Sequence, residues 1–255
     1  MTKSNSEPII QVKDLSHTFP NGLQALKDVN FTARKGEFIL CTGRNGSGKT
    51  VFLRHLNALY LPTAGQVLIA GSDTKSHPAF ARRTIGMVFQ DADSQIVGQT
   101  VRQDISFGPE NLRLPAGEIR FRVDHAMETM ELTHLADQRP HLLSGGEKRR
   151  LAIAALLAMD PFALILDEPF TNLDYQGVTS VLRHIVELHR AGHTIILVTH
   201  EIEKVAAHAE RMVIFEEGRV VEDGKPAWVI HKVGTYGLRP FEDFEQEIEK
   251  LTWLK

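Results

Sequence analysis

The stretch that decides the fold is Phe38-Ile39-Leu40-Cys41-Thr42-Gly43-Arg44-Asn45-Gly46-Ser47-Gly48-Lys49-Thr50. Its first part, Phe38–Thr42, is a short apolar run typical of a buried strand, and it leads directly into a glycine-rich loop. The residues that follow, Thr50–Leu59, carry apolar side chains at helical spacing. The order strand, loop, helix predicts an α/β fold with a ligand site at the loop.

The loop matches the phosphate-binding P-loop pattern, which is a glycine, four residues, and then Gly-Lys followed by Ser or Thr. Its glycines let successive backbone N–H groups point into one concavity, and the helix N-terminus adds the positive end of its dipole. We expect Lys49 to reach the β- and γ-phosphates of a nucleotide and Thr50 to offer its hydroxyl to Mg²⁺. The predicted triphosphate contacts are Gly43, Arg44, Asn45, Gly46, Ser47, Gly48, Lys49 and Thr50.

Acidic residues that a P-loop site needs come at the end of a second apolar run, Phe162–Leu166. Asp167 is placed to hold the metal, and Glu168, one residue further out, to polarise an attacking water as general base. His200 follows a third apolar run, Thr194–Thr199, and so emerges at the same sheet edge, where an imidazole can contact the γ-phosphate and support Glu168. The sequence therefore predicts hydrolysis rather than binding alone.

Strand-like and helix-like runs alternate over the rest of the chain, which indicates a mostly parallel sheet. Two short runs near the N-terminus and a third after a turn predict an antiparallel sheet there, and the interval between Gln95 and Leu143 lacks strand signals and is expected to form an inserted helical lobe. The predicted strands are Ile9–Lys13, Leu15–Phe19, Val29–Ala33, Gln66–Ala70, Ile85–Phe89 and Met212–Phe215, and the predicted helices include Glu118–Leu135, Glu147–Met159 and segments starting at Tyr175 and Ile202.

Composition limits the functional class. The chain has 255 residues, 42% hydrophobic and 24% charged, which are ordinary values for a folded protein. A net charge of −3 argues against a nucleic-acid partner. No apolar run approaches the roughly 18 residues that span a bilayer, and the polar N-terminus does not resemble a secretory signal. Cys41 is interpreted as a buried core residue.

The motif that identifies the family is Leu143-Ser144-Gly145-Gly146-Glu147, which resembles the signature of ABC ATPases. It is a second glycine-rich cradle at the head of a helix, and one chain has no further phosphate for it to bind. In the ABC family, two subunits enclose two nucleotides head to tail, and each lends its signature to the other. The resemblance therefore implies that Ser144, Gly145 and Gly146 contact a partner's ATP.

The same resemblance covers nearly the whole chain and assigns further residues. Gln90 resembles the glutamine that contacts nucleotide and Mg²⁺, Asn172-Leu173-Asp174 resembles the D-loop and places Asp174 near nucleotide, and His200 resembles the switch histidine. Phe19 stands where the family usually has a tyrosine that stacks on adenine, and His17 could substitute for it. Val51 stands at a nucleotide-contacting position of the family that often carries a hydroxyl, so the resemblance implies one α-phosphate hydrogen bond fewer at this position.

A narrower resemblance, to the energy-coupling factor (ECF) group of importers, is carried by Gln90-Asp91-Ala92-Asp93-Ser94-Gln95 and by the stretch from Thr100 to Leu112. It implies a peripheral protein on the cytoplasmic face of the membrane, with ATP and Mg²⁺ bound. The implied partners are a second ATPase subunit, a transmembrane coupling protein and a substrate-binding membrane protein. The cargo would be a vitamin or a transition-metal ion such as cobalt or nickel.

The expected architecture is a P-loop NTPase fold of the ABC type, with a mostly parallel core sheet, an antiparallel N-terminal β subdomain and an inserted helical lobe. We expect a RecA-like core with that β subdomain at residues 1–94 and 158–225, a helical signature subdomain at 95–157, and a helical extension at 226–255. In the extension, Phe241, Phe244, Ile248 and Leu251 recur at helical spacing. This helix either docks on its own domain or serves dimerisation or partner docking.

Three alternatives stay open at this point. The chain could energise another kind of ABC transporter, act as a soluble ABC ATPase in DNA repair or translation, or bind nucleotide for regulation without hydrolysing it. The intact Glu168 and His200 argue against the third. The cargo, and whether the chain pairs with itself or with a related ATPase, are not encoded in these motifs.

Overall fold

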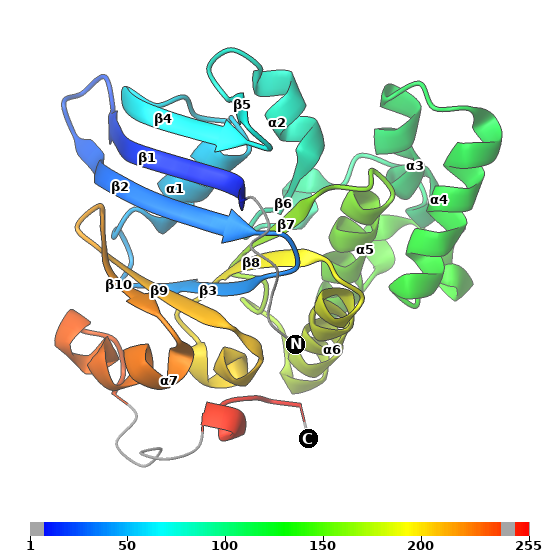
Figure 1. The fold of residues 1–255 in the computed structure, drawn as a ribbon. Coiled ribbons are helices and arrows are strands. Elements are labelled where there is room, and N and C mark those ends of the chain that lie inside the picture. Colours follow the sequence, from blue (N-terminus) through cyan, green and yellow to red (C-terminus); the bar gives the residue numbers. More distant parts are fainter. Residues whose placement is uncertain (1–7, 241–247, 255) are drawn as a thin grey trace.

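In the computed structural model, which describes residues 8–240 and 248–254, a six-stranded sheet forms the centre of the molecule (Figure 1). Its order is β10-β9-β3-β8-β7-β6. The strands from β9 to β6 are parallel to their neighbours, and only β10 runs antiparallel. The predicted mostly parallel sheet is therefore confirmed. Its strands are β3 (Phe38–Thr42), β6 (Ile85–Val88), β7 (Ala163–Asp167), β8 (Thr194–Val198), β9 (Arg211–Glu216) and β10 (Arg219–Gly224).

Strand β3 is buried on both faces, so its alternating side chains enter two different apolar clusters. Phe38 and Leu40 pack into the cluster that contains α5 and α6, whereas Ile39 and Cys41 pack into the cluster with α1 and the second sheet. Cys41 is fully buried, as predicted, and burial raises the pKa of its thiol to about 12. The helices are α1 (Lys49–Leu56), α5 (Gly145–Leu157) and α6 (Tyr175–Arg190).

The second sheet is antiparallel, with the order β2-β1-β4-β5, and it lies across α1 from the central sheet (Figure 1). The two short strands predicted at Ile9–Lys13 and Leu15–Phe19 are one continuous strand. The strand bulges around Asp14, whose φ is 48°, which explains the break in the apolar alternation. The strands are β1 (Pro8–Thr18), β2 (Gln24–Arg34), β4 (Ala64–Ile69) and β5 (Ser72–Asp73).

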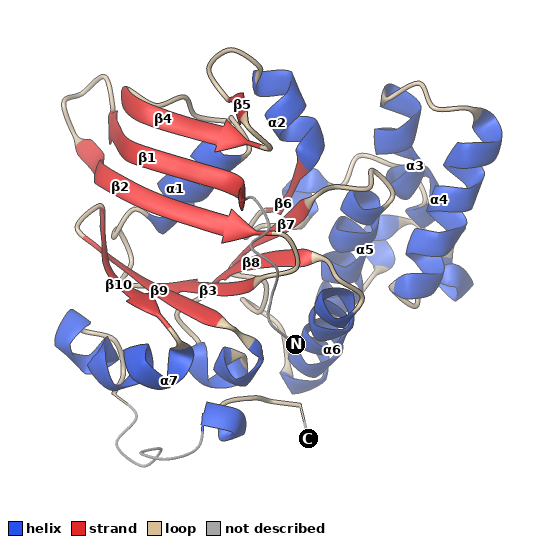
Figure 2. Cartoon of the chain, viewed as in Figure 1, coloured by secondary structure: helices blue, strands red, loops and turns tan. Residues whose placement is uncertain are grey.

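Helices fill the interval between β6 and β7, on the side of the molecule away from the antiparallel sheet (Figure 2). Two of them, α3 and α4, lie in the interval where the sequence predicted a helical lobe, and α4 overlaps the predicted helix Glu118–Leu135. Helix α4 ends at Thr129, well before the predicted end at Leu135. These helices are α3 (Val101–Asn111) and α4 (Ala116–Thr129), and α2 (Pro78–Thr84) precedes β6.

The helix predicted to start at Ile202 is wrong. The structure has two 3₁₀ turns there, Ile202–Lys204 and Ala206–His208, joined at Val205 with φ −140°. The C-terminal segment takes the backbone groups that a helix would use, since Lys204 O accepts from the Trp253 N–H at 3.2 Å and the Ala207 N–H donates to Leu251 O at 3.0 Å. A local apolar pattern is thus overridden by tertiary hydrogen bonds.

The C-terminal part after β10 is short and mostly irregular. It comprises α7 (Pro226–Val229) and two 3₁₀ segments, Ile230–Tyr236 and Ile248–Lys250. The predicted helical residues Phe241 and Phe244 lie outside the described residues, and of the remaining two Leu251 is buried. Strand β10 was not predicted from the sequence. Within residues 8–240 and 248–254, no helix has the length and apolar character needed to cross a membrane.

Candidate functional site

The glycine-rich loop crosses from the end of β3 to the start of α1. Gly43 has a φ of 145°, and a Cβ there would lie 2.2 Å from the carbonyl oxygen of Phe215 on β9. Gly48, the N-cap of α1, has a φ of 102°, and its Cβ would lie 2.8 Å from the carbonyl oxygen of Ala25 on β2. Both positions require glycine, because the loop is pressed between the two sheets.

Lys49 and Thr50 begin α1 and point their polar groups toward the loop and the sheet edge. Lys49 Nζ donates to the carbonyl oxygens of Gly43 at 2.6 Å and Arg44 at 3.0 Å, and burial lowers the pKa of its ammonium group. Thr50 Oγ1 donates to Oδ2 of Asp167 at 3.1 Å, and burial raises the pKa of that carboxyl group. A cation, a hydroxyl and a carboxylate therefore lie together where β3 and β7 end.

Glu168 follows β7 with a φ of 48°, a left-handed conformation that costs free energy for a residue with a side chain. Its N–H donates to Val198 O on the neighbouring β8 at 2.8 Å. His200 Nδ1 lies 3.0 Å from Glu168 Oε1, and since a carboxylate only accepts, Nδ1 carries the proton. The other oxygen, Oε2, is buried and has no hydrogen-bond partner in the described chain. The carboxylate is thus oriented by one imidazole and keeps one oxygen for a proton donor.

One cavity of about 520 Å³ gathers most of the predicted site residues. Gly43 and Arg44 are not among its lining residues, and the exposed Arg44 side chain lies beside Gly237 instead. The cavity combines loop N–H groups, two lysines, three carboxylates and a histidine, and its lysine, carboxylate and histidine groups at the P-loop supply the chemistry of phosphate binding and hydrolysis. Its predicted lining residues are Phe19, Asn45, Gly46, Ser47, Gly48, Lys49, Thr50, Val51, Gln90, Asp167, Glu168 and His200.

The signature residues lie elsewhere. Ser144 is exposed and is the N-cap of α5, where its Oγ accepts from the Glu147 N–H at 3.3 Å and the Glu147 carboxylate accepts from the Ser144 N–H at 2.8 Å. Gly145 lines a second cavity of about 320 Å³, which also includes Gln90. Ser144, Gly145 and Gly146 do not line the first cavity in the described structure. The P-loop and the signature motif, the two glycine-rich loops of the chain, therefore do not line the same cavity.

Asp174 was predicted to lie near nucleotide through its resemblance to a D-loop residue. The structure uses its carboxylate as the N-cap of α6, where Oδ1 accepts from the Gly177 N–H at 2.7 Å. It lines neither of the two cavities, and Asn172 and Leu173, just before it, line the second. A nucleotide contact for Asp174 stays a prediction.

A comparison with known families decides the identity. The model described as "ABC transporter" matches residues 26–171, a span that includes the P-loop, the signature and both acidic residues at the end of β7. The chain belongs to the ABC transporter family. As an ABC ATPase it binds ATP and hydrolyses it.

Curated relatives cover most of this ABC ATPase. It is 43% identical over 232 residues to the energy-coupling factor transporter ATP-binding protein EcfA1 of Caldanaerobacter subterraneus, covering 88% of this chain and 83% of that protein. It is 41% identical over 239 residues to the cobalt import ATP-binding protein CbiO of Rhodobacter capsulatus, covering 91% and 85%. EcfA of Methanocaldococcus jannaschii is 38% identical over 230 residues, covering 89% and 82%.

Solved structures agree with the fold. The CbiO1 protein of Clostridium perfringens, described as part of the ABC transporter complex cbiONQ, superposes with a TM-score of 0.81 at 37% identity, covering 90% of this chain and 96% of that one. The ATP-binding cassette MJ0796, solved as a dimer in a post-hydrolysis state with ADP and Pi, gives a TM-score of 0.75 at 30% identity, covering 85% and 98%. The predicted ABC ATPase fold is confirmed.

At the base end of the ABC site, Phe19 lines the first cavity and is half-buried. His17 does not line it. His17 is buried behind Phe19, with ring centroids 4.7 Å apart, and stacks on Tyr60 at 5.3 Å. Its Nδ1 lies 3.1 Å from Nε2 of His55. Of these two residues only Phe19 lines the cavity, with His17 packed behind it, and the contact of Phe19 with a base stays a prediction.

Two residues that the sequence did not identify make hydrogen bonds to the loops of the ABC site. Arg149, on α5, donates to the carbonyl oxygens of Phe89 at 2.7 Å and Gln90 at 2.8 Å. Gly218, with φ 81°, donates to Ser47 O of the P-loop at 3.0 Å. The Glu217-Gly218 pair signals a turn in the sequence, but nothing local indicates that this turn contacts the P-loop.

Proposed function

We propose that this ABC ATPase is the energising subunit of an ECF-type importer, bound at the cytoplasmic face of a membrane, and that two such subunits close around two ATP molecules. The observation that carries the proposal is the division of the site. Lys49, Glu168 and His200 line one cavity, whereas the exposed Ser144 heads a helix outside it. A complete site needs the signature of a second subunit.

Within each site, Glu168 acts as the general base. Its unpaired Oε2 accepts a proton from the attacking water, while the hydrogen bond from His200 to Oε1 keeps the carboxylate aimed at the cavity. The P-loop N–H groups and Lys49 stabilise the negative charge of the phosphates, which is the main task in phosphoryl transfer. Hydrolysis then lets the two subunits separate, and this motion drives transport.

Thr50 and Asp167 fit a magnesium ion. A hydroxyl and a carboxylate 3.1 Å apart are oxygen ligands of the kind Mg²⁺ prefers, and Gln90 lines the same cavity with a further amide oxygen. Within the described residues no group of three or more His, Cys, Asp or Glu side chains could hold a metal alone. This agrees with an ion that arrives with the nucleotide, whose charge it would neutralise when bound.

Replacing the general base tests this assignment. We expect Glu168→Gln to bind ATP with unchanged affinity and to lose about 10²–10⁴ in turnover, because the amide cannot accept the proton. Phosphate release measures turnover, and the fluorescence of a labelled ATP analogue measures binding. Glu128→Gln, the same change at an exposed carboxylate of α4, is the control and should hydrolyse ATP at the normal rate. Hydrolysis by Glu168→Gln at more than half the normal rate would remove Glu168 from this role.

The ECF subtype is supported by the Gln90–Leu112 resemblance and by the names of the curated relatives, which include ECF transporter and cobalt import proteins. The cargo on this basis is a transition-metal ion, cobalt first, or a vitamin. The competing function is an ATPase of another kind of ABC transporter. In both cases the cargo contacts the membrane proteins rather than this chain.

An uptake assay separates these possibilities. The chain is produced together with the membrane proteins encoded beside its gene, and labelled cobalt, nickel and vitamins are offered to the cells. We expect uptake of one of these cargoes that requires Lys49, with Lys49→Ala as the inactive control. Purification with a membrane partner but without uptake of any of these cargoes would favour the other ABC transporter.

A further inference from the structure

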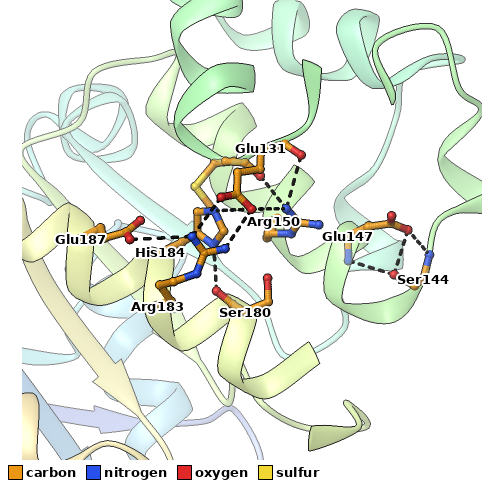
Figure 3. Close-up of polar contacts among 9 residues, drawn as sticks. Glu131, Ser144, Glu147, Arg150, Ser180, Arg183, His184 and Glu187 are labelled. Atoms are coloured by element: carbon orange, nitrogen blue, oxygen red, sulfur yellow. Dashed lines mark hydrogen bonds and ion pairs between the residues drawn. The ribbon is translucent and has the colours of Figure 1, made fainter. Parts of the chain in front are cut away.

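A partly exposed ionic cluster joins the signature helix to the helix that follows the D-loop, with Glu131 53% and Arg183 43% exposed. It comprises Glu131, at the end of α4, Arg150 on α5, and Arg183 and His184 on α6, and we call it the Glu131 cluster (Figure 3). Neither the motif pattern nor the proposed mechanism uses any of these four residues. They converge on one carboxylate, which connects the segment after α4 to α5 and α6.

Glu131 has a φ of 52°, in the left-handed region that favours glycine. Its side chain makes contacts that a glycine could not supply. Arg183 donates to both carboxylate oxygens at 2.9 Å each, a paired geometry that fixes direction as well as charge. These hydrogen bonds lower the pKa of Glu131 to about 2, so it is ionised at any physiological pH. The backbone conformation at this turn is thus held by a bond to α6.

Arg150 connects this carboxylate to the signature. Its Nη1 donates to Met130 O at 2.9 Å and lies 3.7 Å from Glu131 Oε2, and its side chain is only 12% exposed. On the same helix α5, the charge of Arg150 also acts on Glu147, which caps Ser144. Burial would raise the pKa of Glu147, but hydrogen bonds from Ser144 and the charge of Arg150 lower it. Figure 3 shows Ser144 and Glu147 beside the cluster.

His184 closes the cluster from the core side. It is 1% exposed, and its Nδ1 lies 2.8 Å from Ser180 O, so Nδ1 carries the proton that a carbonyl oxygen accepts. Its Nε2 faces Glu131 Oε2 at 3.7 Å and has no hydrogen-bond partner in the described chain. Burial lowers the pKa of His184 and keeps it neutral. The histidine therefore packs beside the Glu131 carboxylate without a charge, and the electrostatic attraction to this carboxylate comes from Arg150 and Arg183.

We propose that Glu131 is a positioning residue for the signature motif: it locks α5 against α6 so that Ser144 and Gly145 are presented correctly to the ATP of a second subunit. The proposal rests on the proposed function, in which signatures act across the dimer. The proposal predicts that the two ATP sites of a dimer are affected differently when only one subunit lacks Glu131. Loss of Glu131 impairs the site that its own signature completes and leaves its own P-loop intact, because the first cavity contains no member of the cluster.

The first measurement compares dimerisation with binding. Glu131→Gly is made in the Glu168→Gln background, in which ATP-bound dimers accumulate. Because glycine also relieves the left-handed strain, we expect the melting temperature to change little. Affinity for a labelled ATP analogue should be unchanged, while the concentration of ATP that half-saturates dimer formation should rise about 3- to 30-fold, the range for altered coupling networks. A merely structural role would lower melting temperature and binding together.

The second measurement uses mixed dimers of two differently tagged copies, one carrying Lys49→Ala so that a single ATP site works. With Glu131→Gly on the Lys49→Ala copy, the variant signature completes the working site, and we expect hydrolysis to fall. With Glu131→Gly on the other copy, that signature faces the inactive P-loop, and the rate should match the Lys49→Ala reference. Equal rates in the two arrangements would overturn the proposal.

Controls keep the outcome clear. Glu118→Gln removes the ion pair with Arg122 on the exposed side of α4, at 2.7 Å, and should change neither dimerisation nor rate. If Glu131→Gly does not fold, Glu131→Gln in the same mixed dimers gives the same contrast, since it removes the charge and keeps the shape. If the Glu168→Gln protein binds ATP but forms no dimers at all, the shared-site function fails, not the role of Glu131.

Discussion

At the scale of single residues, His55 shows how the P-loop helix is fixed to the sheet beside it. It is fully buried, and its Nδ1 lies 2.8 Å from Val51 O, so this nitrogen carries the proton. Nε2 is then an acceptor for the N–H of His17 Nδ1, 3.1 Å away. Protonation of His55 would bring two N–H groups face to face, so the pair is built for the neutral form.

This pair predicts a pH dependence of stability. Burial lowers the pKa of His55 from 6.5 to about 4, so the unfolded chain takes up a proton that the folded chain refuses. The contribution to the free energy of unfolding is fully present above pH 6.5 and is lost as the pH falls toward 4, by about 3 kcal/mol in total. In urea titrations, His55→Gln should show a shallower fall over this range than the native chain. Parallel curves for the two proteins would contradict the assignment.

The sequence predicted those residues whose chemistry is local. Gly43–Thr50 and Asp167-Glu168 each lie within one motif, so their local patterns alone predicted a joint site, and Asn45–Thr50 and both acidic residues do line one cavity. The contact of His17 with His55 spans 38 positions and exists only because β1 docks on α1. Glu131 was missed for a similar reason, since its partners come from two distant helices, α5 and α6, and its left-handed φ has no sequence signal.

At the scale of elements, α5 is attached to the rest of the site through Arg149. This buried guanidinium reaches across 60 positions to Phe89 O and also bonds to Gln90 O, so it links the signature helix directly to the Gln90 loop. Gly145 lies against the D-loop on the same side, where a Cβ would be 3.0 Å from a Leu173 methyl carbon. The helix is therefore held from two neighbouring loops.

Removing the hydrogen bonds of Arg149 to the Gln90 loop should lower the stability of the folded chain. Arg149→Met removes the donor of the Phe89 and Gln90 carbonyl oxygens, which are partly buried, and we expect the free energy of unfolding to fall by about 1–3 kcal/mol. Urea denaturation measures this loss. Arg120→Met, at an exposed position of the same lobe with a side chain 85% exposed, should leave the midpoint unchanged. An Arg149→Met midpoint equal to that of the native chain would show that the two hydrogen bonds contribute nothing.

Elements with continuous apolar patterns were predicted well, and those shaped by distant contacts were not. Strand β3 has the bounds expected from its five apolar-run residues. The helix expected at Ile202 is replaced by 3₁₀ turns because the C-terminal segment takes its backbone groups, and β10 exists because β9 offers it an edge. The apolar periodicity of a sequence shows which face of a helix or strand can be buried. It does not show which other segment of the chain will cover that face.

At the scale of the whole molecule, the P-loop cavity and the signature face are separate parts of one chain. The first collects residues from both sheets and α1, whereas the second lies at the head of α5 among the helices (Figure 1). The resemblance of Leu143–Glu147 to the ABC signature implied this separation, since one chain has no further phosphate site for the signature to bind. A head-to-tail pair of chains is the arrangement that brings the two parts together.

Blocking the signature therefore tests the pairing. We expect Ser144→Arg to bind a labelled ATP analogue normally but to form no ATP-dependent dimer and to lose hydrolysis, because the bulky side chain fills the face that meets the partner's phosphate. Sedimentation with and without ATP measures pairing. Ser106→Arg, a half-buried serine on α3 outside both cavities, controls for added charge. Hydrolysis at the normal rate by monomeric Ser144→Arg would overturn the shared site.

The ring of Phe19, which lines the cavity, also bears on which nucleotide the protein hydrolyses. Stacking reads the flat face of a base and is nearly indifferent to the groups on its edge, so an aromatic ring without a hydroxyl separates purines poorly. We therefore expect GTP to be accepted almost as readily as ATP by the purified protein. In a living cell, the abundance of each nucleotide rather than the shape of the pocket would then decide which one powers the cycle.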